Sequence, residues 1–102
     1  MITLDYIQTK VLGFCNCGEP EENIAFLGKI LKDIDTLSTV KWEDYEEWNK
    51  KSLELFGNEQ SRYFIWYYLH KEGFTEHGGS VPGWLTDKGK ELLKDIESCL
   101  EN

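Results

Sequence analysis

The stretch LHKEGFTEHGGSVPGWLTDKGKELL, Leu69 to Leu93, changes its hydrophobic period twice. Gly73 is expected to end a helix, because glycine readily takes the left-handed conformation that closes one. Two short strands, Phe74–Glu76 and Val81–Leu85, are predicted around a Gly-Gly-Ser turn. Pro82 cannot donate to a strand ladder, so we expect it at an edge or a bulge. The fold must therefore place a small β-hairpin between two helices.

A last helix is predicted after the hairpin. Thr86 or Asp87 should cap its start, because a side-chain oxygen there can accept an otherwise unpaired backbone N–H. Apolar residues then recur at helical spacing. Those expected to face the core are Leu92, Leu93, Ile96 and Leu100.

Four further helices are expected before the hairpin. The first should run from Thr3 to about Gly13, where the glycines and asparagine of GFCNCGEP interrupt the pattern. The second should begin at Pro20, which suits the first helical turn, and end near Asp35. Its predicted inward face consists of Ile24, Leu27, Ile30 or Leu31, and Ile34.

The third helix is predicted between Trp42 and Phe56. Ser38 or Thr39, which precede it, is expected to cap its start. The fourth should span roughly Glu59–Glu72, with Asn58 as its N-cap. Apolar residues expected on the inner side of the third helix are Trp42, Tyr45, Trp48, Leu53, Leu55 and Phe56.

Composition favours one folded domain spanning residues 1–102. The chain is 40% hydrophobic and contains four Trp, five Tyr and five Phe, which is enough large apolar surface for a core. No apolar run is long enough to span a bilayer, so we expect no membrane partner. The N-terminal MITLDYIQTK does not resemble a secretion signal, which leads us to expect a cytoplasmic location.

The order helix, glycine, hairpin, Leu-Thr, Lys-Gly, helix resembles the end of bacterial winged-helix repressors of the MarR and PadR type. The resemblance implies that Leu85 anchors the wing, Thr86 caps the next helix and Gly89 permits close packing. It also implies a mainly α (α+β) fold of about five helices with a C-terminal winged-helix-like β-hairpin. The matching residues are Leu69, Gly73, Phe74, Leu85, Thr86, Lys88, Gly89, Leu92 and Leu93.

Two motifs resemble small uncharacterised proteins of bacteriophages and prophages. They are GFCNCGEPE, Gly13 to Glu21, and FTEHGGSVPGWLTDKGKELL, Phe74 to Leu93. This resemblance implies an origin in a mobile element and an action inside the host cell. It carries no activity with it.

Net charge argues against DNA as the ligand of the wing. The chain carries a formal charge of −8, which repels a polyanion. Winged-helix proteins lay the helix before the wing in the major groove. In this chain that helix contains only two cations, Arg62 and Lys71. The wing offers His77, Ser80 and Trp84, none of which is Lys or Arg. A DNA-binding regulator stays the alternative, because a homodimer could gather cations that are separated in the sequence.

The aromatic residues of the helix before the hairpin suggest a protein-binding surface. Tyr63, Trp66 and Tyr67 are candidate anchors, because Tyr and Trp are enriched at protein interfaces. The alternative is a core helix that packs on several sides. A set of carboxylates could add an acidic face for a basic partner, although acids also stabilise helix starts. These candidates are Glu43, Glu46 and Glu47.

The sequence gives little support for a catalytic or a metal site. Cys15, Cys17, His77 and Cys99 could in principle bind zinc, but one residue between the first two differs from the spacing of zinc fingers. A cysteine nucleophile with His77 and Glu76 lacks the strand-turn-helix context of known nucleophiles. We therefore expect no metal, no cofactor and no catalytic residue, and predict a small acidic protein that binds a host protein.

Overall fold

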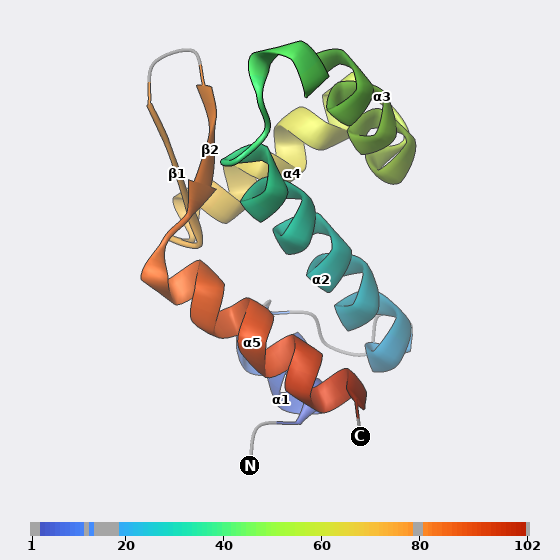
Figure 1. The fold of residues 1–102 in the computed structure, drawn as a ribbon. Helices are drawn as coiled ribbons and strands as arrows, with labels where there is room; N and C mark the ends of the chain where they lie inside the picture. The colour runs from blue at the N-terminus through green and yellow to red at the C-terminus, as the bar shows by residue number, and fades with distance from the viewer. Residues whose placement is uncertain (1–2, 12, 14–18, 79–80, 102) are drawn as a thin grey trace.

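The computed structural model describes residues 3–11, 13, 19–78 and 81–101. Within these residues the fold is mainly helical, with five α-helices and one two-stranded antiparallel sheet (Figure 1). The prediction of a helical fold with a small hairpin is confirmed at this level. The elements are α1 (Leu4–Tyr6), η1 (Ile7–Val11), α2 (Pro20–Leu37), η2 (Trp42–Asp44), α3 (Tyr45–Phe56), α4 (Glu59–Lys71), β1 (Thr75–Gly78), β2 (Val81–Leu85) and α5 (Asp87–Glu101).

The central element is α2, which contacts α5, the hairpin strand β2, the N-terminal helical turns and α3. Pro20 occupies its first turn, followed by Glu21 and Glu22, whose carboxylates favour the positive end of the helix dipole. Its predicted inward face is confirmed, and both alternatives at the third position are buried. The buried residues are Ile24, Leu27, Gly28, Ile30, Leu31, Ile34 and Leu37.

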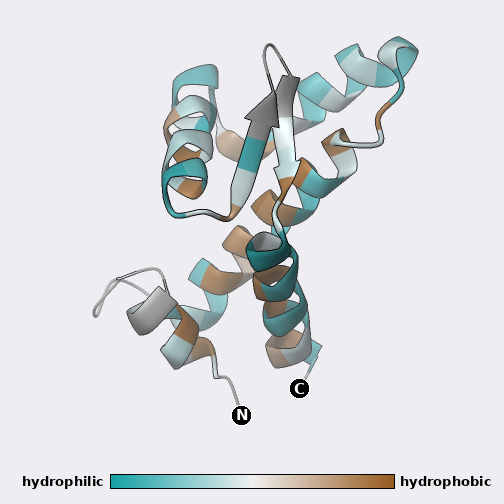
Figure 2. Cartoon of the chain, turned by 90° about the vertical axis from the view of Figure 1, so that its left-hand side faces the viewer, coloured by the Kyte–Doolittle hydropathy of each residue, from teal (hydrophilic) through white to brown (hydrophobic). Residues whose placement is uncertain are grey.

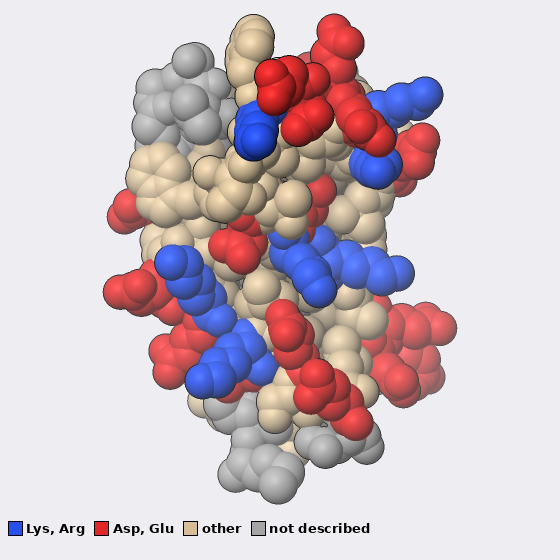
Figure 3. All heavy atoms as spheres, viewed as in Figure 1, with Lys and Arg blue, Asp and Glu red and all other residues tan. Residues whose placement is uncertain are grey.

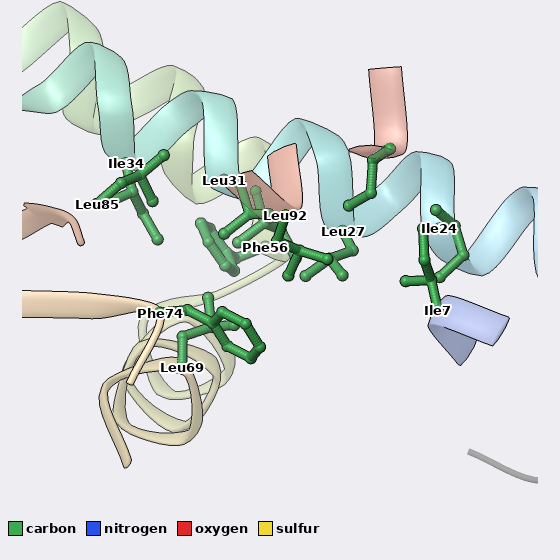
Figure 4. Packing of buried hydrophobic residues seen from close by; sticks show 12 residues of the cluster. Ile7, Ile24, Leu27, Leu31, Ile34, Phe56, Leu69, Phe74, Leu85 and Leu92 are labelled. Carbon is green, nitrogen blue, oxygen red and sulfur yellow. The ribbon is translucent and has the colours of Figure 1, made fainter. Parts of the chain in front are cut away.

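One apolar core joins α2 to the other elements. Leu27 and Leu31 point from α2 toward Phe56 of α3 and Leu92 of α5, and Leu69 and Phe74 close the core from α4 and the hairpin (Figure 4). Figure 2 colours the chain by hydropathy, with hydrophilic residues along the outer side of α5 and hydrophobic residues where the helices meet. Burial of this continuous apolar surface is the main force that orders the helices.

A tight junction links the hairpin to α5. Leu85 is buried in the core, and the Thr86 hydroxyl accepts a hydrogen bond from the Gly89 backbone N–H at 3.1 Å, so Thr86 is the N-cap. The same hydroxyl donates to the Gly73 carbonyl at 2.7 Å. Gly89 lies so close to the Phe74 carbonyl oxygen that a β-carbon would clash with it. The local roles expected of Leu85, Thr86 and Gly89 are therefore present.

The hairpin contains the irregularity expected around Pro82. Glu76 pairs with Trp84 and Gly78 with Val81, so His77 alone faces both Pro82 and Gly83. The extra residue on β2 is a β-bulge, and Gly83 has a φ of 108° there, a value that favours glycine.

Two helix boundaries differ from the prediction. The expected helix from Thr3 to Gly13 is a single α-helical turn followed by the π-helical η1, in which Gln8 is buried and accepts a hydrogen bond from the Asn23 amide at 2.8 Å. Ser38 and Thr39 do not cap the following helix. Their hydroxyls donate back to the carbonyls of Asp35 and Thr36, so they stabilise the end of α2, which extends to Leu37.

Two apolar positions expected in the core are exposed. Leu100 lies in the last turn of α5 and is exposed. Trp42 lies in the 3₁₀ turn η2 and not on the inner face of α3, which begins only at Tyr45, and its side chain is 90% exposed. Among the helices that the structure describes, none has both the length and the apolar character needed to cross a bilayer.

Candidate protein-binding surface

Helix α4 has two faces of different character. The Asn58 side chain caps its start by accepting a hydrogen bond from the Ser61 N–H at 2.8 Å, and Gly73, with a φ of 84°, follows its end. Leu69 faces the core, whereas Tyr63, Phe64 and Tyr67 are exposed by 67%, 68% and 61%. Tyr67 lies four residues after Tyr63 and three after Phe64, so the three rings share the outward side of α4.

Two of these rings, Tyr63 and Phe64, line a shallow depression. The rings of Tyr63 and Phe64 meet edge to face, with centroids 6.1 Å apart and planes at 78°. Glu59 and Gln60 complete the lining of an open depression of about 280 Å³. We refer to Glu59, Gln60, Tyr63, Phe64 and Tyr67 as the α4 surface. It combines exposed aromatic rings, which are enriched at protein interfaces, with a carboxylate and an amide.

Arg62 points into the protein, on the opposite side of α4. Its side chain is only 8% exposed, and the guanidinium carbon lies 4.8 Å from the centre of the Trp66 ring and 5.6 Å from that of Trp48. These contacts are cation–π interactions, in which the ring face attracts the positive charge. Nη1 is buried without a hydrogen-bond partner among the described residues. One of the two cations that the sequence places on this helix is therefore unavailable to an external ligand.

Asp33 of α2 lies near this buried cation. The Ser52 hydroxyl donates to its Oδ2 at 2.8 Å, and Ser52 is fully buried. Burial raises the pKa of Asp33 above the ordinary value of 3.8, and this effect outweighs the Ser52 hydrogen bond, the charge of Arg62 and the nearby Trp48 N–H, which all lower the pKa. The indole N–H of Trp48 is near Asp33, but it has no hydrogen-bond partner among the described residues. The Asp33 carboxyl group is therefore harder to ionise in the folded protein than in the unfolded chain.

A pH-dependent difference between the wild type and Asp33→Asn is expected. Because the folded-state pKa of Asp33 lies above 3.8, the native state holds this proton more tightly than the unfolded chain does. The free energy of unfolding of the wild type should thus fall, relative to Asp33→Asn, as the pH rises from 3.8 through the raised folded-state pKa. Urea unfolding of both proteins across this window measures the difference. A difference that rises with pH would show that the cation and hydrogen bonds outweigh burial.

The acidic candidates gather at another part of the surface. Glu43, Glu46 and Glu47 are all exposed, as is Asp44. Acidic side chains crowd the region of η2 and the start of α3 in Figure 3. Glu47 forms an exposed ion pair of 3.5 Å with Lys51, which contributes little to stability. Within residues 3–11, 13, 19–78 and 81–101, no other ion pair involves these carboxylates.

The predicted aromatic anchors do not all lie together. Tyr63 and Tyr67 belong to the α4 surface, but Trp66 is half-buried on the core side. The Trp66 ring lies parallel to Trp48, 6.3 Å away with planes at 19°, and meets the edge of Phe56 at 6.2 Å. Phe64 takes its place in the exposed stripe, a residue that sequence reasoning missed although its spacing from Tyr67 gives the signal.

The hairpin presents one of its predicted contact residues. Trp84 is exposed on β2, opposite Glu76. Ser80 and the side chain of His77 lie outside the described residues. Lys88, just after the hairpin, donates to the Glu72 carbonyl at 2.8 Å, and its ammonium lies 4.7 Å from the centre of the Phe74 ring. This cation is thus partly engaged within the protein.

The cysteine predictions fall mostly outside the described part of the chain, because Cys15 and Cys17 belong to residues 14–18. Cys99 lies on α5, partly buried against the core. Among the described residues, no three or more His, Cys, Asp or Glu side chains gather in a way that could hold a metal ion.

Comparisons with protein-family models, with curated proteins and with solved structures find no match to this chain. The α4 surface and the acidic region around η2 are therefore the basis for a functional assignment.

Proposed function

We propose that this chain is a non-catalytic, protein-binding factor of a phage or prophage. Its partner would be a host protein in the cytoplasm, contacted through the α4 surface and the carboxylates Glu43, Glu46 and Glu47. Such a factor could act by interaction or inhibition, for example against a host defence. The phage-like motifs GFCNCGEPE and FTEHGGSVPGWLTDKGKELL support the origin, and the absence of any identified catalytic constellation in the sequence favours binding over catalysis.

We further propose that β1 and β2 form a winged-helix-like hairpin. The order α3, α4, hairpin, α5 supports this interpretation, as does the Thr86 cap beside the close approach of Gly89 to Phe74. In this arrangement α4 takes the place of the helix that enters the major groove in DNA-binding relatives of the fold. The assignment of the ligand then depends on what α4 exposes.

The single observation that carries the proposal is the outward face of α4. Tyr63, Phe64 and Tyr67 occupy the stripe where a DNA-reading helix would carry polar and cationic groups. Arg62 is buried under the indoles, so Lys71 is the only Lys or Arg of α4 that is exposed. A face of this kind lacks the cations that neutralise phosphates but has the rings that anchor protein interfaces.

The alternative function is a winged-helix DNA-binding regulator. The element order favours it, and a homodimer could bring the exposed Lys71 and Lys90 of two subunits together. Against it, cations are interleaved with acidic side chains on the face shown in Figure 3. We therefore favour a protein partner.

A triple variant, Tyr63→Ala, Phe64→Ala and Tyr67→Ala, tests the proposal. The wild type and the variant would be immobilised and exposed to host lysate, and the affinity for the captured protein measured. We expect a loss of more than about tenfold, because truncated aromatic anchors typically account for most interface energy. Phe26→Ala, an exposed ring on α2, is the matched control and should change nothing. Equal capture by the triple variant would exclude the α4 surface.

A further inference from the structure

Trp42 is an exposed indole without a structural role that explains its position. It lies in η2, a turn fixed by backbone hydrogen bonds, including Asp44 N–H to the Lys41 carbonyl at 2.9 Å. Its side chain is 90% exposed and contacts Tyr45 on one face only, with ring centroids 6.1 Å apart and planes at 20°. The other face of the indole is open to solvent. Exposed Trp of this kind is typical of interface anchors, because burial of the ring on binding is favourable.

Trp42 is the outer end of a row of neighbouring rings. Tyr45 follows it and lies 5.4 Å from Trp48, which in turn stacks on Trp66 at 6.3 Å. At the inner end of this row, the Arg62 guanidinium already lies against the Trp48 and Trp66 rings. The protein therefore binds one guanidinium on its own indoles, and the open indole at the outer end offers the same chemistry to an external group.

Exposed carboxylates lie close to Trp42 in the chain. Glu43, Asp44, Glu46 and Glu47, which follow Trp42 within five residues, are all exposed. In the part of the chain that the structure describes, only Glu47 among these four pairs with a lysine. We call Trp42 with these four carboxylates the Trp42 surface. Together with the net charge of −8, it attracts cations and repels nucleic acid and anionic lipid. It also disfavours a second copy of the same chain, which carries the same charge.

We propose that the Trp42 surface docks an arginine-rich segment of a protein partner. One guanidinium stacks on the open face of the Trp42 indole, and neighbouring cations of the segment pair with Glu43, Asp44, Glu46 and Glu47. Arginine fits better than lysine, because its planar guanidinium can stack on a ring and pair with a carboxylate at the same time. The inference rests on the proposed protein-binding function and specifies the chemistry of the partner.

The test uses the full chain and a short peptide that alternates arginine and glycine. Titration followed by NMR of the indole N–H signals should shift the Trp42 signal saturably, with that signal assigned from Trp42→Phe. Trp42→Ala should lower the affinity for the peptide by about fivefold or more, since cation–π contacts to Trp contribute on that scale. This variant keeps the net charge, so it separates stacking from general attraction. Trp84→Ala, an exposed Trp on the hairpin, is the matched control and should bind as the wild type does.

Unchanged affinity in Trp42→Ala would overturn the proposal, because charge alone would then hold the peptide. The absence of saturable binding by the wild type would overturn it too. The triple variant of Tyr63, Phe64 and Tyr67 should still bind the peptide. If the triple variant binds the peptide and also captures the host protein as the wild type does, the α4 surface is not the binding site. The Trp42 surface would still be supported.

Discussion

Gly89→Ala is expected to lower the free energy of unfolding by about 3 kcal/mol, the upper range for overpacking at a tight contact. In an ordinary helix the change would stabilise the protein by about 1 kcal/mol, because alanine has the higher helix propensity. Here the new β-carbon would clash with the Phe74 carbonyl oxygen and contact the Leu85 side chain at 3.4 Å. A backbone oxygen cannot turn away as a flexible side chain can, so α5 must shift from the hairpin.

Two control variants isolate this clash. Lys90→Ala, at an exposed position of the same helix, should leave stability nearly unchanged. Gly57→Ala has open space around its β-carbon but a φ of 93°, so we expect only a backbone-strain cost of about 1 kcal/mol. Urea unfolding of the three variants gives the comparison. A Gly89→Ala protein as stable as the wild type would mean that the junction between hairpin and α5 is looser than described.

Arg62→Ala should lower the free energy of unfolding by about 3 kcal/mol, comparable to large-to-small changes in cores. The arginine fills the space beside the Trp48 and Trp66 rings, so its removal leaves a void and ends two cation–π contacts. The change also withdraws the positive charge that acts on the half-buried Asp33 carboxylate. The packing loss occurs at the contact between α3 and α4, and the loss of charge affects Asp33 on α2.

Arg62→Met distinguishes the two contributions. Methionine keeps most of the volume between the indoles but carries no charge, and buried charges can often be replaced by apolar residues of similar size at little cost. We expect less than half of the loss seen for alanine, because packing is the larger contribution. Equal losses for alanine and methionine in thermal or urea unfolding would instead assign the stability to the charge.

Local signals in the sequence predicted many elements of the fold. The Asn58 cap, the left-handed Gly73 and the Thr86 cap are determined by residues within one helical turn, and all three are confirmed. The buried stripe of α2 is also confirmed, since helical spacing alone fixes which residues share a face. Local chemistry therefore defined the helix ends and the central helix.

Tertiary packing decided what the sequence could not. Ser38 and Thr39 can cap either the preceding or the following segment, and the structure uses them at the end of α2. Trp42 looks like a core residue by spacing, but a 3₁₀ turn before α3 moves it off the buried face. These differences arise because a hydroxyl or an apolar ring has several local solutions of similar energy.

The candidate surface was only partly predictable for the same reason. Rings surround α4, so spacing alone could not tell which side would face the core; Tyr63 and Tyr67 are exposed, whereas Trp66 is half-buried. An arginine on a helix is normally exposed, yet Arg62 is buried because two indoles from α3 and α4 accommodate its guanidinium. The orientation of α4 depends on contacts between segments that are distant in sequence.

Titration of a labelled DNA duplex with the purified chain, over a range of salt concentrations, tests most directly whether α4 is a protein-binding or a DNA-reading helix. With aromatic rings on its outward face and Arg62 turned inward, we expect no binding at protein concentrations up to about 100 µM near physiological salt. Tight binding that weakens steeply as salt is raised would show that enough cations converge on phosphates, and would contradict a protein-binding role for α4.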